Sequence, residues 1–555
     1  MVGNSTGNQY SRNNIPKNSR GPFGSRPEIN FERTKSANPR HSSHDSKSCD
    51  GSSWNTGMIA DSHSANPGDL INFMVSGPEY DGSMIEFFFA SDVSGSSLNN
   101  MYIKSKKQNL IRLSTSKLHI PAEKNRSCIL SPWKEKPSWE IVANVTVPQN
   151  WSGELVVARL APNDTDVYAT RYWYLTVRHK LKYENNNPSA QNNPPEIAVM
   201  YNLFTNDVAY NGFGGYSFYS RPFDSNNGMI FSLYRPTGDN SQSAGNLQIY
   251  SWIKKKGITD YQAFNDLDLN FRCHEISMSK LWILTSHPEY WTLKQKKCLE
   301  EYLDSGGRMI YLAANGIYRR VEFDEVTKDT IQYQLNGTFT IRGHEGEKGG
   351  EWENIAEKSN HPAKLTGGIF DSTLLCAGGA YKIEIPDHWA FMEARKLLSD
   401  DLYGKGLQFA GTVVPPENYG CIEVHSLSNS DQIKLGNLIT PLGAAGWEVD
   451  SITEESPEEY DLIGTSTQTK DQSKGAILMY FRRGKGCVFS SNSMVSPWGL
   501  HNDIIFSGMV EGIINTMIND CPDIKDKTPW GLWVLLGVCL LFMSIGFVIL
   551  IKIIR

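Results

Sequence analysis

The stretch of sequence that decides the fold is LWILTSHPEYW, residues 281–291. It begins with four apolar residues, which are typical of a strand buried on both faces of a parallel sheet. Pro288 suits the first position of a helix, and the helical spacing that follows ends at two glycines, residues 306–307. His287 and Glu289 are therefore predicted at a strand-to-helix turn, on the carboxyl edge of the sheet, where α/β proteins bind ligands.

The same residues also have a purely structural explanation. Ser286 or His287 could cap the helix, and Glu289 in its first turn would be favoured by the positive end of the helix dipole, by about 0.3–1 kcal/mol. The stretch alone favours this capping role. A functional role needs support from elsewhere in the chain.

Length and charge exclude some classes of protein. The chain has 555 residues, 54 Lys and Arg, 60 Asp and Glu, and a formal net charge of −6. This length accommodates two or three domains, each with its own core. The negative balance argues against nucleic acid as a partner, because nucleic acid needs a clustered positive surface. The nine cysteines include no C-x-x-C pair that would suggest zinc or redox chemistry.

Composition divides the chain into segments. Residues 1–65 are rich in Ser, Asn, Gly, Arg and Lys, and we expect a disordered tail. Residues 66–182 carry β-branched and aromatic runs separated by turn residues, which predicts a β-sandwich domain. A polar linker follows over residues 183–196. From 197 to 521, strand-like blocks alternate with helical segments, which predicts a mostly parallel α/β domain of the flavodoxin or amidotransferase-like kind.

The last segment, residues 530–551, reads WGLWVLLGVCLLFMSIGFVILI and carries no charge. As a helix it would be about 33 Å long, enough to cross a hydrocarbon core of about 30 Å. Trp530 and Trp533 suit one membrane interface, and Lys552 and Arg555 suit the other. The sequence thus predicts a C-terminal transmembrane helix and a single-pass membrane protein, with the lipid bilayer as a partner.

The side of the membrane depends on weaker signals. The basic residues after the apolar segment fit a cytosolic C-terminus, so we expect an extracellular or lumenal body. The first 65 residues lack the apolar core of a secretory signal, which fits the alternative of a tail-anchored protein with a cytosolic body. Six N-glycosylation triplets do not decide the matter, because a chain this rich in Asn and Ser contains a similar number by chance.

Several polar stretches come directly after predicted strands of the α/β domain. FTNDVAYNGFGGYSFYSRP follows the first strand, and HPEYW and AANGIY follow two strands that should be neighbours. LGAAGWEVDS lies much farther along the chain. Because the carboxyl ends of parallel strands share one edge of a sheet, their polar groups should converge there.

These motifs, in this order, resemble the large subunit of N,N-dimethylformamidase, an amide hydrolase with a mononuclear iron. The resemblance covers nearly all of the predicted folded chain, from GDLINFMVSG to GCVFSSNSMVSPWGL. It implies a hydrolase of small amide C–N bonds with one ferric iron per chain. It also implies a small amide substrate, and a small subunit or further copies of the chain as partner. The sequence does not support dimethylformamide itself as the substrate.

In that family two tyrosines and one glutamate hold the iron. By position in the motifs, the resemblance implies Tyr210 of AYN, Tyr219 of SFY and Glu289 of HPEYW as metal ligands. Phenolate and carboxylate oxygens are hard donors, which suit ferric iron better than metals that prefer Cys or His. A phenol titrates near about 10, so a metal ion is needed to hold a tyrosinate at neutral pH.

The resemblance implies three catalytic residues in the same way. Glu448 of GAAGWEVD would accept a proton from the attacking water and return it to the departing amine, with Asp450 as the alternative. His287 would lie close to the metal, and Asn315 of AANG would position the substrate.

Two other interpretations stay open. A non-catalytic binding or adhesion protein could keep the fold and need no metal, although retention of the ligand residues favours the enzyme. A nucleophilic enzyme of the amidotransferase kind would need Ser286 at the turn with a histidine as base, and its neighbour His287 is poorly placed for that role. We expect HEGEKGGEW, with His344 and Glu347, to form a solvated loop.

Overall fold

A computed structural model describes residues 56–93, 113–120, 134, 136–162, 170–179, 194–211, 217–218, 228–237, 241–335, 337–374, 377–398, 403–411, 443–467 and 474–524. Almost all of them belong to one compact unit, which spans Asn30–Cys521. The predicted tail up to residue 55, most of the predicted linker and the apolar segment 530–551 lie outside the described residues.

Two sheets form the N-terminal part of the unit. One apolar cluster contains residues of both sheets. At its centre the ring of Phe73 lies 5.5 Å from that of Phe87, which lies 5.4 Å from that of Trp151. The three-stranded sheet has the order β1 (Gly57–Ala60), β3 (Leu70–Ser76), β6 (Ile141–Thr146), and the five-stranded sheet has the order β2 (Ser64–Ala65), β8 (Arg171–Val177), β7 (Leu155–Leu160), β4 (Ile85–Phe89), β5 (Leu113–Ser114).

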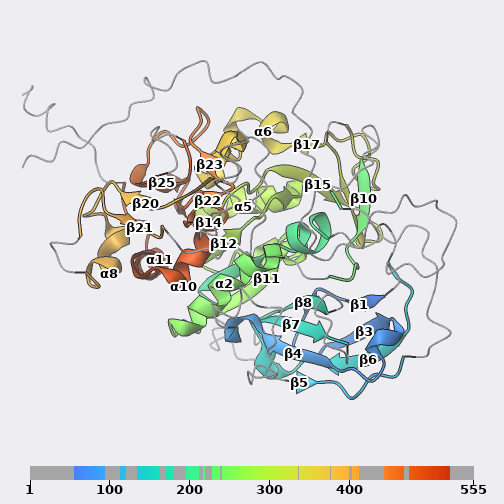
Figure 1. The fold of residues 1–555 in the computed structure, drawn as a ribbon. Helices are drawn as coiled ribbons and strands as arrows, with labels where there is room; N and C mark the ends of the chain where they lie inside the picture. Colours follow the sequence, from blue (N-terminus) through green and yellow to red (C-terminus); the bar gives the residue numbers. More distant parts are fainter. Residues whose placement is uncertain are drawn as a thin grey trace, which may run out of the picture. The chain divides into compact units, whose positions relative to one another are not determined.

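A nine-stranded mixed sheet forms the centre of the rest of the unit (Figure 1). Its strand pairs from β11 to β26 are parallel, and those from β26 to β21 are antiparallel. The order is β11 (Tyr261–Asn265), β9 (Ile197–Tyr201), β12 (Leu281–Ser286), β14 (Arg308–Ala313), β26 (Gly486–Ser490), β25 (Ile477–Arg483), β24 (Asp461–Ser466), β20 (Tyr381–Ile383), β21 (Gln408–Phe409).

The predicted fold class, a flavodoxin-like and mostly parallel α/β domain, is therefore wrong. The reason lies in the connections of the last strands. Only Gly484 and Lys485 join β25 to β26, and so short a link allows only antiparallel pairing, whereas a parallel pair needs a crossover of a dozen or more residues. Gly484 has a positive φ of 55°, which suits a tight hairpin turn.

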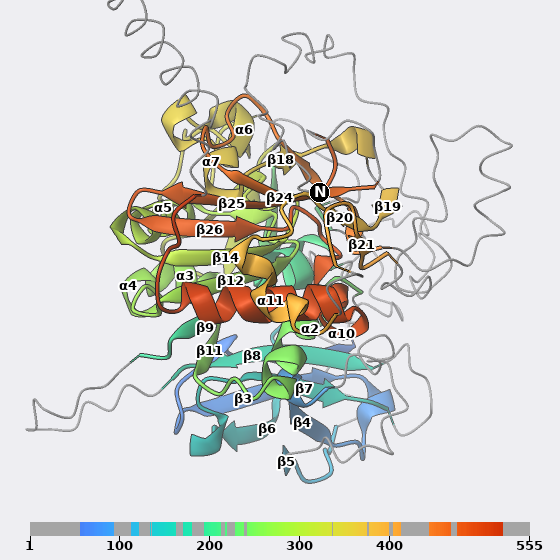
Figure 2. The ribbon, with the colours of Figure 1, turned by 90° about the vertical axis from the view of Figure 1, so that its left-hand side faces the viewer.

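Helices cover the central sheet. Figure 2 shows β25, β26, β14, β12, β9 and β11 in this order, with α11 in front of the sheet and running in about the same direction as its strands. On α5, Tyr302 stacks on Trp282 of β12, with 4.1 Å between ring centroids. The helices of the described residues are α2 (Ser241–Lys255), α3 (Asp266–Phe271), α4 (Cys273–Ile276), α5 (Leu293–Ser305), α6 (Trp352–Ile355), α7 (Ala363–Thr366), α8 (Met392–Arg395), α10 (Gly499–Asn502) and α11 (Ile504–Met517).

The helix after LWILTS begins later than Pro288. Tyr290 and Trp291 first form a short strand, β13, and the helix α5 begins at Leu293. Thr292 caps it, because its hydroxyl accepts a hydrogen bond from the backbone of Gln295, whose side chain accepts one from Thr292. The predicted glycine stop is present, since Gly306 ends the helix with a φ of 116°.

A second, smaller sheet lies beside the carboxyl end of β12. It contains β10 (Met229–Ser232), β16 (Thr330–Tyr333), β15 (Arg319–Phe323), β13 (Tyr290–Trp291) and β17 (Gly350–Glu351). Two-stranded pairs complete the unit: β18 (Ile369–Phe370) with β23 (Asp450–Ser451), and β19 (Ala377–Gly379) with β22 (Ala445–Trp447).

Asp268 of α3 connects the N-terminal sheets to the central sheet. Its buried carboxylate accepts hydrogen bonds from Ser64 (2.8 Å) and Thr176 (2.9 Å) and pairs with Arg178 (3.2 Å). The same side chain completes the capping box of Asn265, the residue before α3. One carboxylate thus organises a polar contact between strands β2 and β8 and the first turn of α3.

Two disulfides join cysteines in the described part of the unit. Cys273 and Cys298 join α4 to α5, with 5.9 Å between their Cα atoms. Cys487 at the beginning of β26 is bonded to Cys521 after α11, with 5.7 Å between Cα atoms. Arg308 donates to the carbonyls of residues 517–519 at the end of α11, where positive charge favours a helix.

Among the described residues, no helix combines the length and the apolar character needed to cross a bilayer. The predicted localisation as a single-pass membrane protein is corrected accordingly, and the placement of its body outside the cytosol loses its basis. The segment 530–551, on which this prediction depended, lies outside the described residues.

Candidate functional site

Three residues with left-handed backbone conformation border the site. Ser286 (φ 62°) precedes His287, Asn315 (φ 50°) follows β14, and Trp447 (φ 66°) precedes Glu448. Such a conformation is strained for residues other than glycine, by about 1–3 kcal/mol each, and it persists only where the surroundings fix it. Strain of this kind often accompanies functional sites.

His287 and two carboxylates form the centre of the site. The Nε2 atom of His287 lies 3.0 Å from an oxygen of Glu448 and 3.3 Å from an oxygen of Glu289. His287 and Glu289 are buried, and the Glu448 side chain is 12% exposed. Neither ring nitrogen of His287 makes a well-directed hydrogen bond within the described part of the chain. The imidazole therefore lies close to both acids without a well-directed hydrogen bond to either.

Asn315 brings the next strand into the site. It follows β14, which pairs with β12 so that Ala313 lies opposite Ser286. Its side-chain amide donates to Glu448 (2.8 Å), and its backbone amide donates to Asp450 (2.7 Å). Of the two carboxylates considered for the proton-transfer role, geometry favours Glu448, because Asp450 already accepts a hydrogen bond from the backbone amide of Asn315.

Tyr210 lies at the end of the π-helix η8 (Phe204–Ala209). Its backbone amide donates to Thr205 (3.1 Å), the wider spacing that defines this rare helix. The ring centroid of Tyr210 lies 5.7 Å from that of His287, at a tilt of 56°. The predicted ligands Tyr210 and Glu289 therefore both lie beside His287. The third, Tyr219, lies outside the described residues.

Arg319 belongs to the site and was missed by sequence analysis. Its Nε atom donates to Glu289 (2.9 Å), and its guanidinium also contacts Tyr333 and, at 3.8 Å, Glu351. The signal was present, since two arginines follow the AANGIY motif directly. Sequence alone does not reveal that β15 pairs with β13 and places Arg319 opposite Tyr290.

The pKa values of the buried acids and the imidazole shift in different directions. Burial disfavours the charged form of His287, but the negative charges of Glu448, Glu289 and Asp450 outweigh it and raise its pKa. Burial alone would raise the pKa of Glu448, yet His287, Asn315 and Arg319 hold it below its usual value. Burial raises the pKa of Asp450 to about 7.

The site suits a metal cation. Three carboxylates, those of Glu289, Glu448 and Asp450, share it with the cationic side chain of Arg319 and with His287, whose buried nitrogens lack well-directed hydrogen bonds. Buried negative charge needs compensation, and carboxylate with phenolate oxygens is a donor set for a hard cation such as ferric iron. The residues present thus fit the implied group.

Ser286 is poorly placed to act as a nucleophile. It is fully buried, and its hydroxyl makes no hydrogen bond within the described residues. The hydroxyl lies against helix α2, so closely that a Cβ atom added to Gly245 would lie 2.4 Å from it. Its side chain therefore packs under the helix, without a hydrogen bond to His287 as base.

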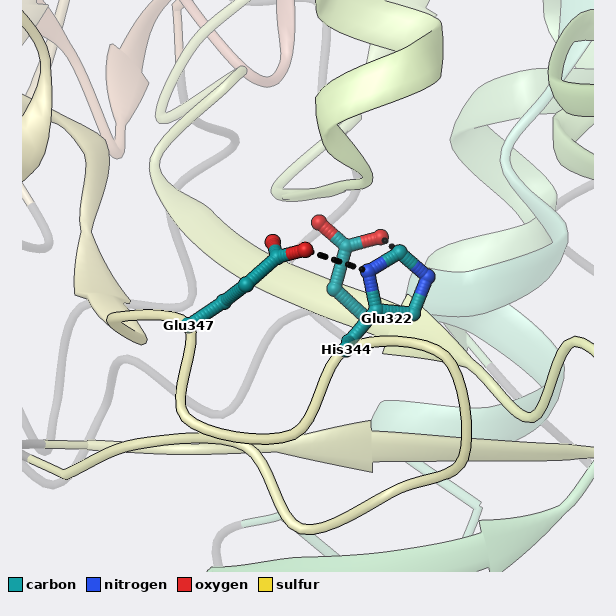
Figure 3. Close-up of side chains that lie close together, drawn as sticks. All are labelled: Glu322, His344 and Glu347. Atoms are coloured by element: carbon teal, nitrogen blue, oxygen red, sulfur yellow. Dashed lines mark hydrogen bonds and ion pairs between the residues drawn. The ribbon is translucent and has the colours of Figure 1, made fainter.

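A second group of side chains, Glu322, His344 and Glu347, has ligand atoms close enough to hold a cation (Figure 3). Nδ1 of His344 faces Glu347 (3.3 Å), whereas Nε2 faces Glu322 (3.6 Å). Arg320 already pairs with both carboxylates. Because a metal ion binds one nitrogen of a ring and the two acids face different nitrogens, this arrangement suits an imidazole held between two acids better than a chelate. The His344 side chain is only 11% exposed, although most residues beside it in the loop are exposed, as expected.

Two known proteins align with short parts of the chain. The N,N-dimethylformamidase beta subunit of Alcaligenes sp is 40% identical over 77 residues, which cover 14% of this chain and 10% of that protein. The N,N-dimethylformamidase beta subunit of Paracoccus aminophilus is 40% identical over 73 residues, or 13% and 9% of the two chains. The matched stretch is thus about a tenth of each relative's length.

Solved structures give only a weak likeness. A β-galactosidase from Bacillus circulans sp. alkalophilus matches with a TM-score of 0.27 and 11% identity, covering 57% of this chain and 30% of its own. The exo-β-1,4-mannosidase Op5Man5 from Opitutaceae bacterium strain TAV5 matches with a TM-score of 0.25 and 10% identity, covering 59% and 35%. Similarity at this level supports no argument about fold or function.

A family model gives the broadest match. The model described as "N,N-dimethylformamidase beta subunit-like, C-terminal" matches residues 112–505, more than half of the chain. This range includes both tyrosine motifs, HPEYW, AANGIY and GAAGWEVD, so the resemblance inferred from these motifs is confirmed. The chain belongs to the N,N-dimethylformamidase beta subunit-like family.

Proposed function

We propose that this protein is an iron-dependent hydrolase of small amide C–N bonds. The observation that carries the proposal is the buried group of His287, Glu289 and Glu448 at the carboxyl end of β12, with Tyr210 beside it. The carboxylates of Glu289 and Glu448 and the phenol of Tyr210 offer the oxygen donors that a hard cation such as ferric iron prefers. Family membership supports amides as the substrate class, because the two relatives are named for an amide.

Tyr210, Tyr219 and Glu289 would hold the iron. When bound, a metal of this kind polarises the amide carbonyl and lowers the pKa of a water molecule. Glu448 has a lowered pKa and is therefore ionised at neutral pH, so that it accepts a proton as the water oxygen attacks the carbonyl carbon. It then returns this proton to nitrogen as the C–N bond breaks, which yields a carboxylic acid and an amine.

His287 and Asn315 would assist Glu448. Both contact the same oxygen of that carboxylate, at 3.0 Å and 2.8 Å. They would keep Glu448 oriented towards the reacting water, and the raised pKa of His287 supports a hydrogen-bond donor at the developing negative charge. We further propose a partner subunit or a second copy of the chain, because the relatives are named as beta subunits.

The metal proposal is tested by iron analysis and visible absorption of the purified chain. We expect about one iron per chain and a phenolate-to-iron charge-transfer band. Tyr210→Phe should remove or shift this band. Tyr250→Phe is the matched control, because Tyr250 is buried and donates to the carbonyl of Val199 in the sheet. An unchanged band and iron content in Tyr210→Phe would refute the ligand assignment.

A panel of formamides and acetamides, assayed by amine or ammonia release, tests the activity. Glu448→Gln should lower the rate about 10²–10⁴-fold, the usual contribution of a general base. Ser286→Ala should keep most of the activity, since its hydroxyl is packed under α2. Loss of activity in folded Ser286→Ala would favour a nucleophilic enzyme. A wild-type chain without iron and without turnover would favour the non-catalytic binding protein.

A further inference from the structure

We infer that Arg319 orients Glu289, by binding one oxygen of the carboxylate so that the other faces His287. The inference rests on the proposed function, because only there is Glu289 a metal ligand. Arg319 would be a positioning residue, acting on the site through Glu289.

The backbone already holds the two residues together. The amides of Tyr318 and Arg319 both donate to the carbonyl of Glu289, at 2.9 Å and 3.0 Å. In the next register position Tyr290 of β13 lies opposite Arg319 of β15 in a parallel pair. The side chains of Glu289 and Arg319 therefore start from neighbouring backbone that cannot shift independently.

Several groups fix the plane of the guanidinium. Its Nε atom donates to Oε1 of Glu289 (2.9 Å), and its Nη1 atom contacts the hydroxyl of Tyr333 and lies 3.8 Å from Glu351. The guanidinium carbon lies 5.0 Å from the ring centroid of Tyr318 and 5.4 Å from that of Tyr333. The side chain is only 14% exposed. A lysine keeps the charge but lacks the planar fork that makes these contacts together.

The consequence is a different environment for each carboxylate oxygen of Glu289. Oε1 is bound to Arg319, whereas Oε2 lies 3.3 Å from Nε2 of His287. A charge-assisted hydrogen bond also withdraws electron density from the acceptor. A carboxylate freed from Arg319 would donate more electron density to a bound metal, but its oxygens would no longer be held in one orientation, and this loss of orientation would weaken binding.

The experiment compares Arg319→Lys with Arg320→Lys in the full chain loaded with ferric iron. Arg320 is the adjacent residue on the same strand and pairs with Glu322 and Glu347 instead. Arg319→Lys should bind iron about 10–100-fold more weakly in competition with a chelator, the usual effect of losing a residue that orients a ligand. Its charge-transfer band should move to shorter wavelength, because a stronger carboxylate donor makes the iron harder to reduce.

Arg320→Lys should leave iron affinity and band position unchanged. A loss of folding alone does not move an absorption band, so the band separates positioning from a structural role. Tyr333→Phe retains Arg319 but removes one of its contacts, and should shift the band in the same direction by a smaller amount. Wild-type affinity and band in Arg319→Lys, or equal changes in Arg320→Lys, would overturn the inference alone. A wild-type chain that binds no iron would overturn the proposed function and this inference with it.

Discussion

Glu448 and Asp450 show how two acids that are two residues apart acquire different properties. Glu448 faces His287 and Asn315, whose charge and hydrogen bonds lower its pKa. Asp450 is buried against the Asn315 backbone and the Tyr311 hydroxyl (2.7 Å and 3.1 Å), and burial raises its pKa to about 7. The first acid therefore stays ionised at neutral pH, and the second holds the Asn315 turn.

Asp450→Asn should change how stability depends on pH. The folded pKa of about 7 exceeds the ordinary value of 3.8, so ionisation destabilises the fold. The contribution of Asp450 to stability is complete below about pH 4 and is lost as pH rises through 7. The amide does not ionise, so the variant should gain up to about 4 kcal/mol over the wild type between pH 4 and pH 8. Urea denaturation at several pH values measures this gain.

A matched control is Asp304→Asn, whose carboxylate is 51% exposed and pairs with Arg483 at the surface. Exposed ion pairs contribute only about 0–1 kcal/mol to stability, so this variant should differ little from the wild type. Parallel stability curves for Asp450→Asn and the wild type would show that Asp450 does not titrate as described.

Candidate site residues could be predicted from the sequence where they directly follow strands or lie in family motifs. His287 and Asn315 could be placed in one site because β12 and β14 are consecutive parallel strands. Arg319 could not, since its contact with Glu289 depends on the short strand β13, which the apolar pattern did not indicate.

The π-helix η8 is the element that presents Tyr210. Buried Arg235 holds its end, because the guanidinium donates to the carbonyls of Val208 (3.1 Å) and Asn211 (2.7 Å), on either side of Tyr210. Burial lowers the pKa of Arg235 to about 9, so the side chain stays charged at neutral pH. π-helical turns are rare and often accompany functional sites, which agrees with a role in placing Tyr210.

Arg235→Met should loosen this element. The change keeps much of the volume but leaves two buried carbonyls without their donor, at about 1–3 kcal/mol each. Equilibrium denaturation should show the loss, and amide exchange of Tyr210 should accelerate. Arg308→Met is the control, because Arg308 also donates to helix carbonyls but at the end of α11; it should destabilise the fold without changing exchange at Tyr210. Unchanged Tyr210 exchange in Arg235→Met would contradict the assigned role.

Among the helices and strands, the pattern of apolar residues and glycines correctly predicted strand β12 and the end of α5 at Gly306. The start of α5 was placed too early because Pro288 suits a helix start, whereas pairing with β15 extends Tyr290 and Trp291. The antiparallel half of the sheet was missed because the helix-strand alternation ends before β24, and only the hairpin at Gly484 reveals the change.

For the molecule as a whole, Asp268 is the residue that couples the N-terminal sheets to the central one. Its carboxylate bonds to Ser64, Thr176 and Arg178 from the N-terminal strands while it caps α3. The presence of strands in the N-terminal region could be predicted from the sequence. This contact was not, because it joins residues about 90 to 200 positions apart.

Asp268→Ala should make the N-terminal sheets and the central sheet unfold less cooperatively. Removing a buried acid leaves Arg178 without this charged partner, an effect of about 3–5 kcal/mol for a buried ion pair, while the hydroxyls of Ser64 and Thr176 keep their bond to each other. Calorimetry should then resolve two transitions, or a broader one, where the wild type shows one. Asp268→Asn, which retains hydrogen-bonding capacity, should give an intermediate result. A single sharp transition in Asp268→Ala at the wild-type temperature would contradict this coupling.

The Cys487–Cys521 disulfide tethers the end of α11 to strand β26 of the central sheet. It closes a loop of chain from the second residue of β26 to a residue just beyond the helix. When α11 opens locally, the bond keeps it near its docking surface at a high effective concentration, so re-docking outcompetes diffusion away from the sheet. Reduction of this one bond would therefore expose the apolar stripe of α11 for longer, and self-association would become sensitive to thiols.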